Sequence, residues 1–391
     1  MKHVIKQYEN SYLSYFLMYF FFFFCVALFS GFISVYLMDM GFRASQVSFV
    51  VSCSFILSML VQPFIGKLND KYEPKYVNSL LLATTIILAL IFVRIRNLYL
   101  IAIIYSIVLS IINGTRPIIE RMAVLSKYKY GSIRVWATIG YALATMISGY
   151  LYAYIAPWSL YIVFGIGEIL CVIGILGTKN TVVETKENVS FKEKVSIRKI
   201  ILNKNMILYL IITCIFYGVT NVHHIYLPTM LRDNGLQINM VSTVIFISTL
   251  SEVPVILLSR FYMNRFSNKQ LLLVVFGLLI IEFGTFAFIS SLTIQILVVF
   301  LTKTVATMSF IMINLKVIAT IVDISLQNTG LSIVSTCKSF ISIIFQMMAG
   351  YVIDYTTFQI FYTILLIFSI IGFIIILSYK IPNNNALQIF H

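Results

Sequence analysis

The sequence predicts an all-α membrane protein with twelve transmembrane helices in two pseudo-symmetric six-helix bundles. Three observations support this prediction. Hydrophobic residues make up 60% of the 391 residues and charged residues only 11%, against about 25% charge in soluble domains. Apolar runs of about 20 residues, the length that crosses a hydrocarbon layer as a helix, follow one another along the chain. The second half also repeats a polar turn of the first.

The apolar runs predict helices because lipid cannot hydrogen-bond an open backbone. The first bundle, residues 1–176, contains the runs 12–37, 44–65, 76–93, 98–121, 133–154 and 159–176. The second bundle, residues 206–391, contains the runs 206–226, 240–261, 270–290, 293–315, 330–353 and 358–378. The longest polar stretch, residues 177–205, is the predicted cytoplasmic linker. The first run is too long for the core of a cleavable signal peptide.

The distribution of Lys and Arg predicts the orientation of these helices. Of the 28 basic residues, twenty-two lie on the side that both chain ends share, and two lie within predicted helices, Lys303 and Lys338. Four lie on the other side: Arg43, Arg94, Arg96 and Arg232. Lys and Arg are enriched on the cytoplasmic side of membrane proteins. We therefore expect a multi-pass protein of the cell membrane, inner or plasma, with both termini in the cytoplasm. The net charge of +14 reflects this bias, so no nucleic-acid partner is expected.

Several other function classes are disfavoured by what the sequence lacks. The five cysteines all fall inside apolar runs without metal-ligand spacing, and no glycine-rich phosphate loop is present. We therefore expect no enzyme activity, no metal and no cofactor. The expected partners are the lipid bilayer and a small polar solute, and the expected state is a monomer.

A tight basic turn occurs at equivalent places in the two halves, at residues 66–75 and 260–269. The first copy contains Gly66, Asp70 and Lys71. A repeated turn predicts a duplicated six-helix unit, and such folds rock their halves around a site near the membrane midplane. The three residues of the first copy are therefore the candidate gating loop.

This turn resembles the signature loop of the major facilitator superfamily. The aromatic run 19–24 and the segments 62–66 and 130–136 are similar to the lactose permease branch of oligosaccharide–proton symporters. Residues 251–254 are similar to the phenylpropionate-permease-like relatives. The resemblance implies the major facilitator fold and secondary transport driven by a proton gradient.

One face of the predicted fifth helix groups polar side chains. Arg134, Thr138, Tyr141 and Thr145 follow at intervals of four, three and four residues, which places them on one stripe. A guanidinium fork donates to hydroxyl oxygens, and an aromatic ring offers a stacking surface. This stripe predicts contact with a polyhydroxylated ring, through Arg134, Thr138 and Tyr141 in particular.

Glu120, near the end of the predicted fourth helix, is the acidic candidate for the same site. The resemblance implies that Glu120 and Arg134 correspond to the sugar-binding Glu–Arg pair of lactose permeases, with Tyr141 in place of a stacking tryptophan. The alternative is that Glu120 pairs with Arg116, four residues earlier on its own helix.

Glu252, Lys303 and Lys338 lie inside predicted helices, where ionisable groups are costly and are candidates for function. The resemblance implies that Lys338 matches a helix 11 lysine, and that Lys303 and Ala306 replace the coupling His and carboxylate of the family. We therefore expect Glu252 to pair with Lys338 and to carry the proton. A static charge network is the alternative.

Two further acids, Glu168 and Glu282, are expected on peripheral helices, and His223 and His224 in a polar outer vestibule. The leading hypothesis for function is proton-coupled uptake of a sugar, oligosaccharide or similar polar solute by alternating access. The alternatives are a proton-coupled exporter of drugs or metabolites, and a nucleoside or aromatic-acid permease.

Overall fold

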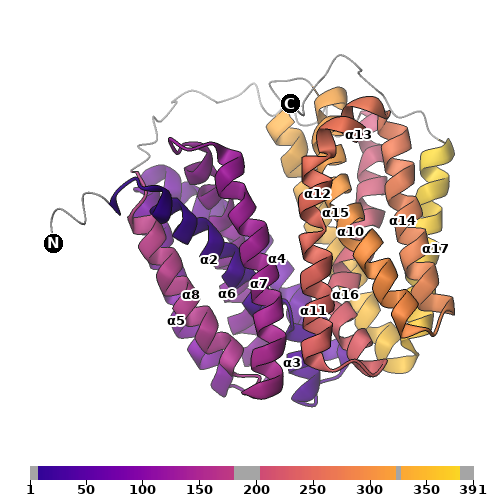
Figure 1. The fold of residues 1–391 in the computed structure, drawn as a ribbon, viewed down its shortest axis with the longest axis horizontal. Helices are drawn as coiled ribbons and strands as arrows, with labels where there is room; N and C mark the ends of the chain where they lie inside the picture. Colours follow the sequence, from indigo (N-terminus) through magenta and orange to yellow (C-terminus); the bar gives the residue numbers. More distant parts are fainter. Residues whose placement is uncertain (1–7, 180–202, 323–326, 379–391) are drawn as a thin grey trace. The chain divides into compact units, whose positions relative to one another are not determined.

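The computed structural model describes residues 8–179, 203–322 and 327–378 (Figure 1). Most of the predicted linker lies outside these residues. The described segments form helices joined by short connections, which confirms the all-α prediction. The helices are α2 (Tyr12–Ser30), α3 (Ile33–Asp39), α4 (Ala44–Lys71), α5 (Pro74–Arg94), α6 (Leu98–Val124), α7 (Tyr130–Tyr154), α8 (Ser159–Leu176), α10 (Lys204–Asp233), α11 (Ile238–Leu250), α12 (Glu252–Leu257), α13 (Ser259–Arg265), α14 (Asn268–Phe288), α15 (Leu292–Ile321), α16 (Gln327–Tyr355) and α17 (Phe358–Ser378).

Within the described residues, eleven candidate spans are long and apolar enough to cross a membrane. The remaining predicted span is the fifth in chain order, α7. It has 25 residues, which is long enough to cross a membrane. It includes the polar residues Arg134, Thr138 and Thr145, which lower its hydropathy. The chain is therefore a multi-pass membrane protein whose least apolar span is the helix that bears the predicted polar stripe.

The chain forms two compact units. Of the described residues, the first unit contains 8–179 and 225–250, and the second contains 203–224, 251–322 and 327–378. Helix α10 therefore contributes its first part to the second unit and its last part to the first, and α11 belongs to the first unit.

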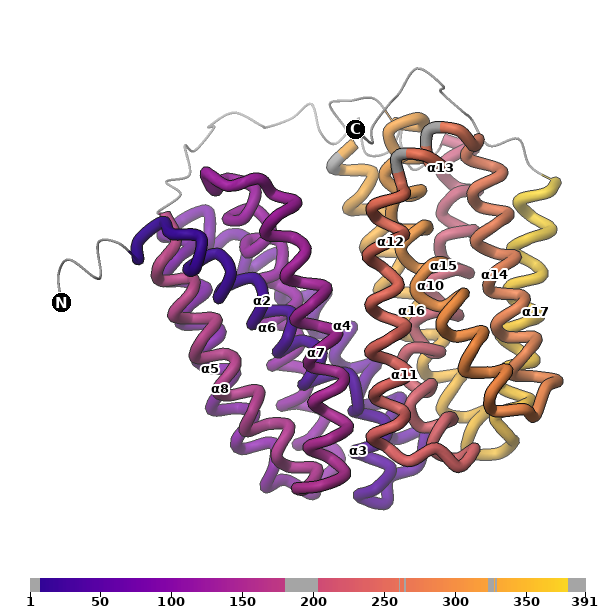
Figure 2. Tube along the Cα trace, viewed as in Figure 1, coloured from indigo at the N-terminus to yellow at the C-terminus, as the bar shows by residue number. Residues whose placement is uncertain are grey.

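In the first unit, α2 packs against α7 and α8, α4 packs against α6, and α5 lies beside α8 (Figure 2). Glycines permit the close approach of α2 to its neighbours. A Cβ atom at Gly140 would meet the backbone of Phe20, and one at Gly174 would meet the backbone of Met18. Small residues are a usual means of close helix packing in membranes, where lipid supplies no hydrophobic drive between helices.

In the second unit, α14 lies beside α17 and packs also against α15 (Figure 1). Phe216 of α10 stacks on Phe310 of α15, with ring centroids 3.7 Å apart and an interplanar angle of 8°. Gly372 of α17 faces the ring of Phe276 on α14. These contacts fill the interior of the unit with aromatic side chains.

Two predicted helices are broken in the structure. The run 12–37 divides into α2 and α3 at Gly31 and Phe32, and the run 240–261 divides into α11, α12 and α13. The break at Ser251 has a clear cause: Pro254 has no amide hydrogen, and its ring clashes with the carbonyl four residues earlier, at Leu250.

The predicted gating loop is also shorter than expected. Helix α4 continues through Gly66, Asp70 and Lys71, so these residues are helical and the turn is reduced to Tyr72 and Glu73. The turn ends there because Pro74, at the start of α5, suits the first turn of a helix.

Candidate functional site

The carboxylate of Glu120, on α6, lies at the centre of a polar cluster in the first unit. The hydroxyls of Tyr19, on α2, and Tyr130, on α7, both donate to Glu120 Oε2 at 2.6 Å. The two hydroxyl oxygens are 3.4 Å apart. Tyr19 is fully buried, and Glu120 is half-buried. The structure thus joins three helices through one carboxylate oxygen.

Two guanidinium groups share one aromatic ring beside this carboxylate. Arg116 and Arg134 lie 5.0 and 5.6 Å from the ring centroid of Phe23, within the range of a cation–π contact. Arg116 also lies within electrostatic range of Glu120 and Arg134. We name Tyr19, Phe23, Arg116, Glu120, Tyr130 and Arg134 the glutamate cluster. The structure therefore brings the predicted Glu120 and Arg134 into one neighbourhood, and Arg116 with them.

The other three residues of the predicted stripe on α7 lie in two different environments. Tyr141 is half-buried and interacts electrostatically with Arg116, so it faces the glutamate cluster. Thr138 and Thr145 are only 4% and 2% exposed. The Thr145 hydroxyl donates to the carbonyl of Ala142 on its own helix at 2.7 Å.

Aromatic side chains of α2 and α7 lie beside the glutamate cluster, and we name Phe16, Phe20 and Trp136 the aromatic wall. The indole of Trp136 donates to the Tyr12 hydroxyl at 2.8 Å, and that hydroxyl donates to the carbonyl of Ser132 at 2.9 Å. Phe16 meets Trp136 edge-on, with centroids 4.7 Å apart, and Phe20 lies 6.4 Å from it. A site at this place would offer flat apolar surfaces beside charged groups.

The second unit contains a buried cluster of ionisable groups. His223 Nε2, on α10, lies 3.1 Å from Glu282 Oε1, on α14, with side chains 4% and 1% exposed. The two atoms have an ion-pair distance without the alignment of a hydrogen bond. His223 Nδ1 lies 3.2 Å from the hydroxyl of Tyr362, on α17. We name His223, Glu282 and Tyr362 the histidine cluster.

Two lysines lie near this cluster. Lys303, on α15, is buried and within electrostatic range of Glu282. Lys338, on α16, lies over the ring of Tyr217 at 4.5 Å. The imidazole of His224 is within electrostatic range of both lysines, and its side chain is exposed, unlike that of His223.

Two predictions for this region stay predictions. The prediction that Glu282 lies on a peripheral helix is not tested by its contact with buried His223. Glu252 begins α12 and is half-buried; its pairing with Lys338 stays a prediction. Glu168 is fully buried on α8.

The two polar turns are each secured by a buried polar side chain. In the first copy, Asn78 of α5 donates to the side-chain oxygen of Asn69 at 2.7 Å. Asp70 is exposed, and Lys71 lies 5.2 Å from the ring centroid of Tyr72. In the second copy, Lys316 Nζ donates to the carbonyls of Met263 and Phe266 at 2.5 and 3.0 Å.

An ion pair in the first unit was missed by the sequence analysis. Arg232 Nη1 lies 2.6 Å from Asp39 Oδ1, and the Tyr152 hydroxyl donates to the other oxygen of Asp39. These residues end α3, α10 and α7, at the side predicted to be outside. Tyr19 and Tyr130 were likewise not recognised as partners of Glu120. The available signal was the position of Tyr19, a polar hydroxyl heading a run of five phenylalanines.

Charged clusters inside apolar helices, on an all-helical membrane fold, are features of membrane transporters. The model of the MFS_1 like family matches residues 12–364, so the chain belongs to this family of transporters and is not an enzyme. Within the described residues, no group of three or more His, Cys, Asp or Glu side chains is placed to hold a metal ion.

Two curated relatives are similar in sequence. The uncharacterized transporter YwbF of Bacillus subtilis (strain 168) is 23% identical over 349 residues, which cover 87% of this chain and 86% of that protein. The maltose permease of Geobacillus stearothermophilus is 23% identical over 265 residues, which cover 66% of each protein.

Two solved structures share the fold. The nucleoside transporter NupG superposes with a TM-score of 0.81 at 17% identity, covering 95% of this chain and 100% of that one. A bacterial homolog of the human lysosomal transporter Spinster, in an inward-facing and occupied conformation, gives a TM-score of 0.71 at 12% identity, covering 96% of each chain. At these identities the likeness concerns the fold alone.

Proposed function

We propose that this transporter takes up a sugar, oligosaccharide or similar small polar solute across the cell membrane by alternating access, coupled to protons. The observation that supports the solute class is the glutamate cluster. A carboxylate and two guanidinium groups meet there beside an aromatic ring, in membrane-spanning helices. A solute with several hydroxyls can donate to Glu120 and accept from Arg116 or Arg134.

The chemistry of this cluster explains how a polar solute would be held. The hydroxyls of Tyr19 and Tyr130 both donate to Glu120 Oε2. Neither of them donates to Oε1, which can therefore accept a hydrogen bond from the solute. Charge-assisted hydrogen bonds are about twice as strong as neutral ones. The similarity to a maltose permease agrees with a sugar as the solute.

A nucleoside is the second candidate, and the aromatic wall favours it. A nucleoside combines ribose hydroxyls with a flat base. The rings of Phe16, Phe20 and Trp136 supply stacking surfaces beside the glutamate cluster. An exporter of drugs or metabolites is less favoured, because the binding groups here are charged and suit a polar solute.

For proton coupling we propose the histidine cluster with Lys303, and we keep Glu252 as the alternative carrier. A buried carboxylate takes up a proton readily when its neighbouring cation moves away, because burial disfavours its charged form. Glu282 has two basic side chains near it, the imidazole of His223 and the ammonium group of Lys303. A change in the distance between them would bind or release a proton.

The proposal is tested with purified protein in vesicles that hold a pH dye in the lumen. A panel of sugars, nucleosides and aromatic acids is added outside, and solute entry and lumen acidification are measured together. Wild type is compared with Arg134→Ala and Glu120→Gln. Arg121→Ala is the matched control, since Arg121 is an exposed basic residue of the same helix end, beside Glu120.

We expect a sugar or nucleoside to enter with protons, and both cluster variants to lose entry while Arg121→Ala keeps it. Entry without lumen acidification would refute the coupling and leave a facilitator. Solute movement that is equal in wild type and both cluster variants would refute the binding site. A response to hydrophobic drugs alone would support the exporter instead.

A further inference from the structure

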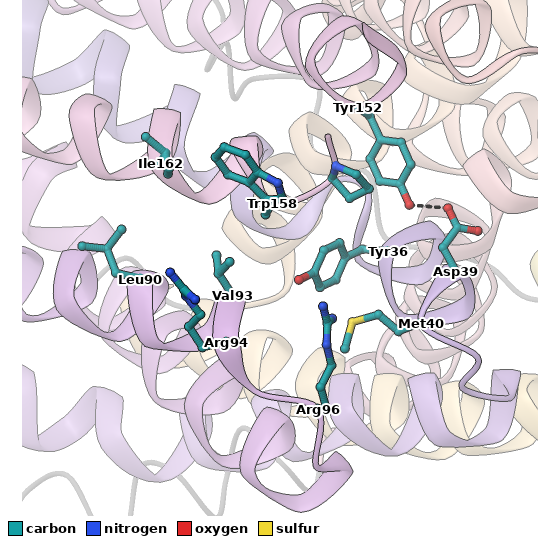
Figure 3. Close-up of a pocket in the computed structure, with 11 residues that line it drawn as sticks. Tyr36, Asp39, Met40, Leu90, Val93, Arg94, Arg96, Tyr152, Trp158 and Ile162 are labelled. Carbon is teal, nitrogen blue, oxygen red and sulfur yellow. Dashed lines mark hydrogen bonds between the residues drawn. The ribbon is translucent and has the colours of Figure 1, made fainter. Parts of the chain in front are cut away.

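A pocket of about 810 Å³ lies in the first unit (Figure 3), and none of its lining residues belongs to the glutamate cluster. It is bounded by the ends of α3, α5 and α7 and the start of α8. Its polar lining includes the guanidinium groups of Arg94 and Arg96 together with Tyr36, and its apolar lining includes Leu90, Trp158 and Ile162. Arg94 is the last residue of α5, and Arg96 lies in the short connection between α5 and α6.

The pocket has an unbalanced positive charge. Arg94 and Arg96 are half of the four basic residues predicted on this side of the membrane, where the usual bias disfavours them. Asp39 also lines the pocket, but Arg232 at 2.6 Å and the Tyr152 hydroxyl already bind its carboxylate. The pocket therefore has the charge to attract an anion.

The apolar part of the pocket continues along the outside of two neighbouring helices. Leu90 of α5 and Ile162 of α8 are 48% and 41% exposed and lie in membrane spans, where exposed apolar side chains face lipid. About one turn further from the pocket, Ile87 of α5 and Ile166 of α8 are also exposed. Because α5 packs beside α8, these side chains form an apolar path that leads from the arginines towards the membrane interior.

We propose that this pocket binds the headgroup of an anionic phospholipid. Arg94 and Arg96 bind the phosphate, because a guanidinium fork matches its oxygens. Trp158 lies at the headgroup level, where tryptophan is enriched. An acyl chain follows the path over Leu90 and Ile162. The combination of a cationic end and an apolar path fits an amphiphile better than a free anion.

The test measures lipid binding to the full chain in a neutral detergent. Short-chain phosphatidylglycerol, phosphatidylcholine of the same chain length, and glycerol 3-phosphate are titrated separately, with Tm and native mass spectrometry as readouts. The variants are Arg94→Gln, Arg96→Gln and the double variant. Arg43→Gln is the matched control, because Arg43 is an exposed arginine on the same side and outside this pocket.

We expect phosphatidylglycerol to bind and raise Tm, and the double variant to weaken that binding by about tenfold or more, the usual effect of a lost charge-assisted hydrogen bond. Arg43→Gln should bind as wild type does. If the double variant does not fold, the single variants carry the test, since each keeps one guanidinium. Equal binding of phosphatidylcholine, binding unchanged in the arginine variants, or equally tight binding of glycerol 3-phosphate would each overturn the proposal.

Discussion

His223 of α10 and Glu282 of α14 meet at 3.1 Å in the interior of the second unit, with almost no exposed surface on either side chain. The third member of the histidine cluster, Tyr362, contacts the other ring nitrogen of His223. Removing two ionisable groups from water is costly unless they compensate one another. Such a pair either stabilises the packing of three helices or stores and releases a proton, and these two roles give different results on mutation.

The first prediction concerns proton movement. Glu282→Gln keeps the shape of the side chain but removes the group that ionises. We expect this variant to keep the exchange of labelled solute across vesicles and to lose proton-driven accumulation. The measurement is lumen acidification beside counterflow, and Glu252→Gln is the comparison. If Glu252→Gln alone loses accumulation, the carrier is Glu252 and the histidine cluster is structural.

The second prediction concerns stability. His223→Ala leaves the carboxylate of Glu282 without its nearest partner and is expected to destabilise the protein by about 3–5 kcal/mol, the usual cost of breaking a buried pair. Replacing both partners by apolar residues, as His223→Phe with Glu282→Leu, should cost less than His223→Ala alone. Denaturation in detergent measures both. A double variant that loses as much stability as His223→Ala, or more, would show that the cost does not come from an unpaired buried carboxylate.

The third prediction tests the hydrogen bonds to Glu120. Tyr19→Phe and Tyr130→Phe each remove one donor at 2.6 Å from Glu120 Oε2. A hydrogen bond to a charged group contributes about 1.5–3 kcal/mol, so we expect solute uptake to fall by about tenfold or more in each variant. Tyr99→Phe, at a side chain that is 68% exposed, is the control and should transport normally. Normal uptake in Tyr19→Phe would show that the hydroxyl of Tyr19 does not contribute to solute binding.

The fourth prediction concerns close helix packing. In Gly174→Ala, the added Cβ meets the backbone of Met18 on α2, and backbone cannot move aside as a side chain tip can. We expect a loss of about 1–3 kcal/mol from overpacking. Gly131→Ala is the matched control, since a Cβ there meets no atom within 4 Å and alanine favours the helix. Equal Tm values for the two variants would contradict the close approach of α8 to α2.

The fifth prediction concerns Asp39 and Arg232. Their side chains are 36% and 28% exposed, so water screens much of the attraction. A double-mutant cycle with Asp39→Asn and Arg232→Gln should give a coupling energy of about 0.2–1 kcal/mol that decreases with added salt. A coupling of several kcal/mol, insensitive to salt, would mean that the pair is far better shielded than its exposed surface indicates.

The sequence was sufficient to predict the transmembrane helices because lipid imposes one local rule on every span. About 20 apolar residues must form a helix whatever their neighbours are. The errors in the predicted helix boundaries also have local causes. The end of α4 was placed too early because Lys67, Asn69 and Asp70 are polar, yet a helix that emerges from the membrane can continue in water. The break at Ser251 was missed although Pro254 marks it.

The candidate site could be predicted only where its residues share one helix or match a known family. Arg134 and Tyr141 share a face of α7, and Glu120 was assigned by resemblance. Tyr19 is 101 positions from Glu120, and no periodicity connects residues so far apart.

The sequence by itself determined that this protein lies in a membrane, which segments cross it, and which charged side chains those segments enclose. Only the tertiary structure decided which of those charges meet. It paired Glu282 with His223, placed Arg116 and Arg134 over one phenylalanine, and gathered Arg94 and Arg96 in one pocket. The physical reason is range. Hydropathy and helix period act between neighbours along the chain, whereas an ion pair acts between atoms a few ångströms apart that the chain brings together only when its helices pack.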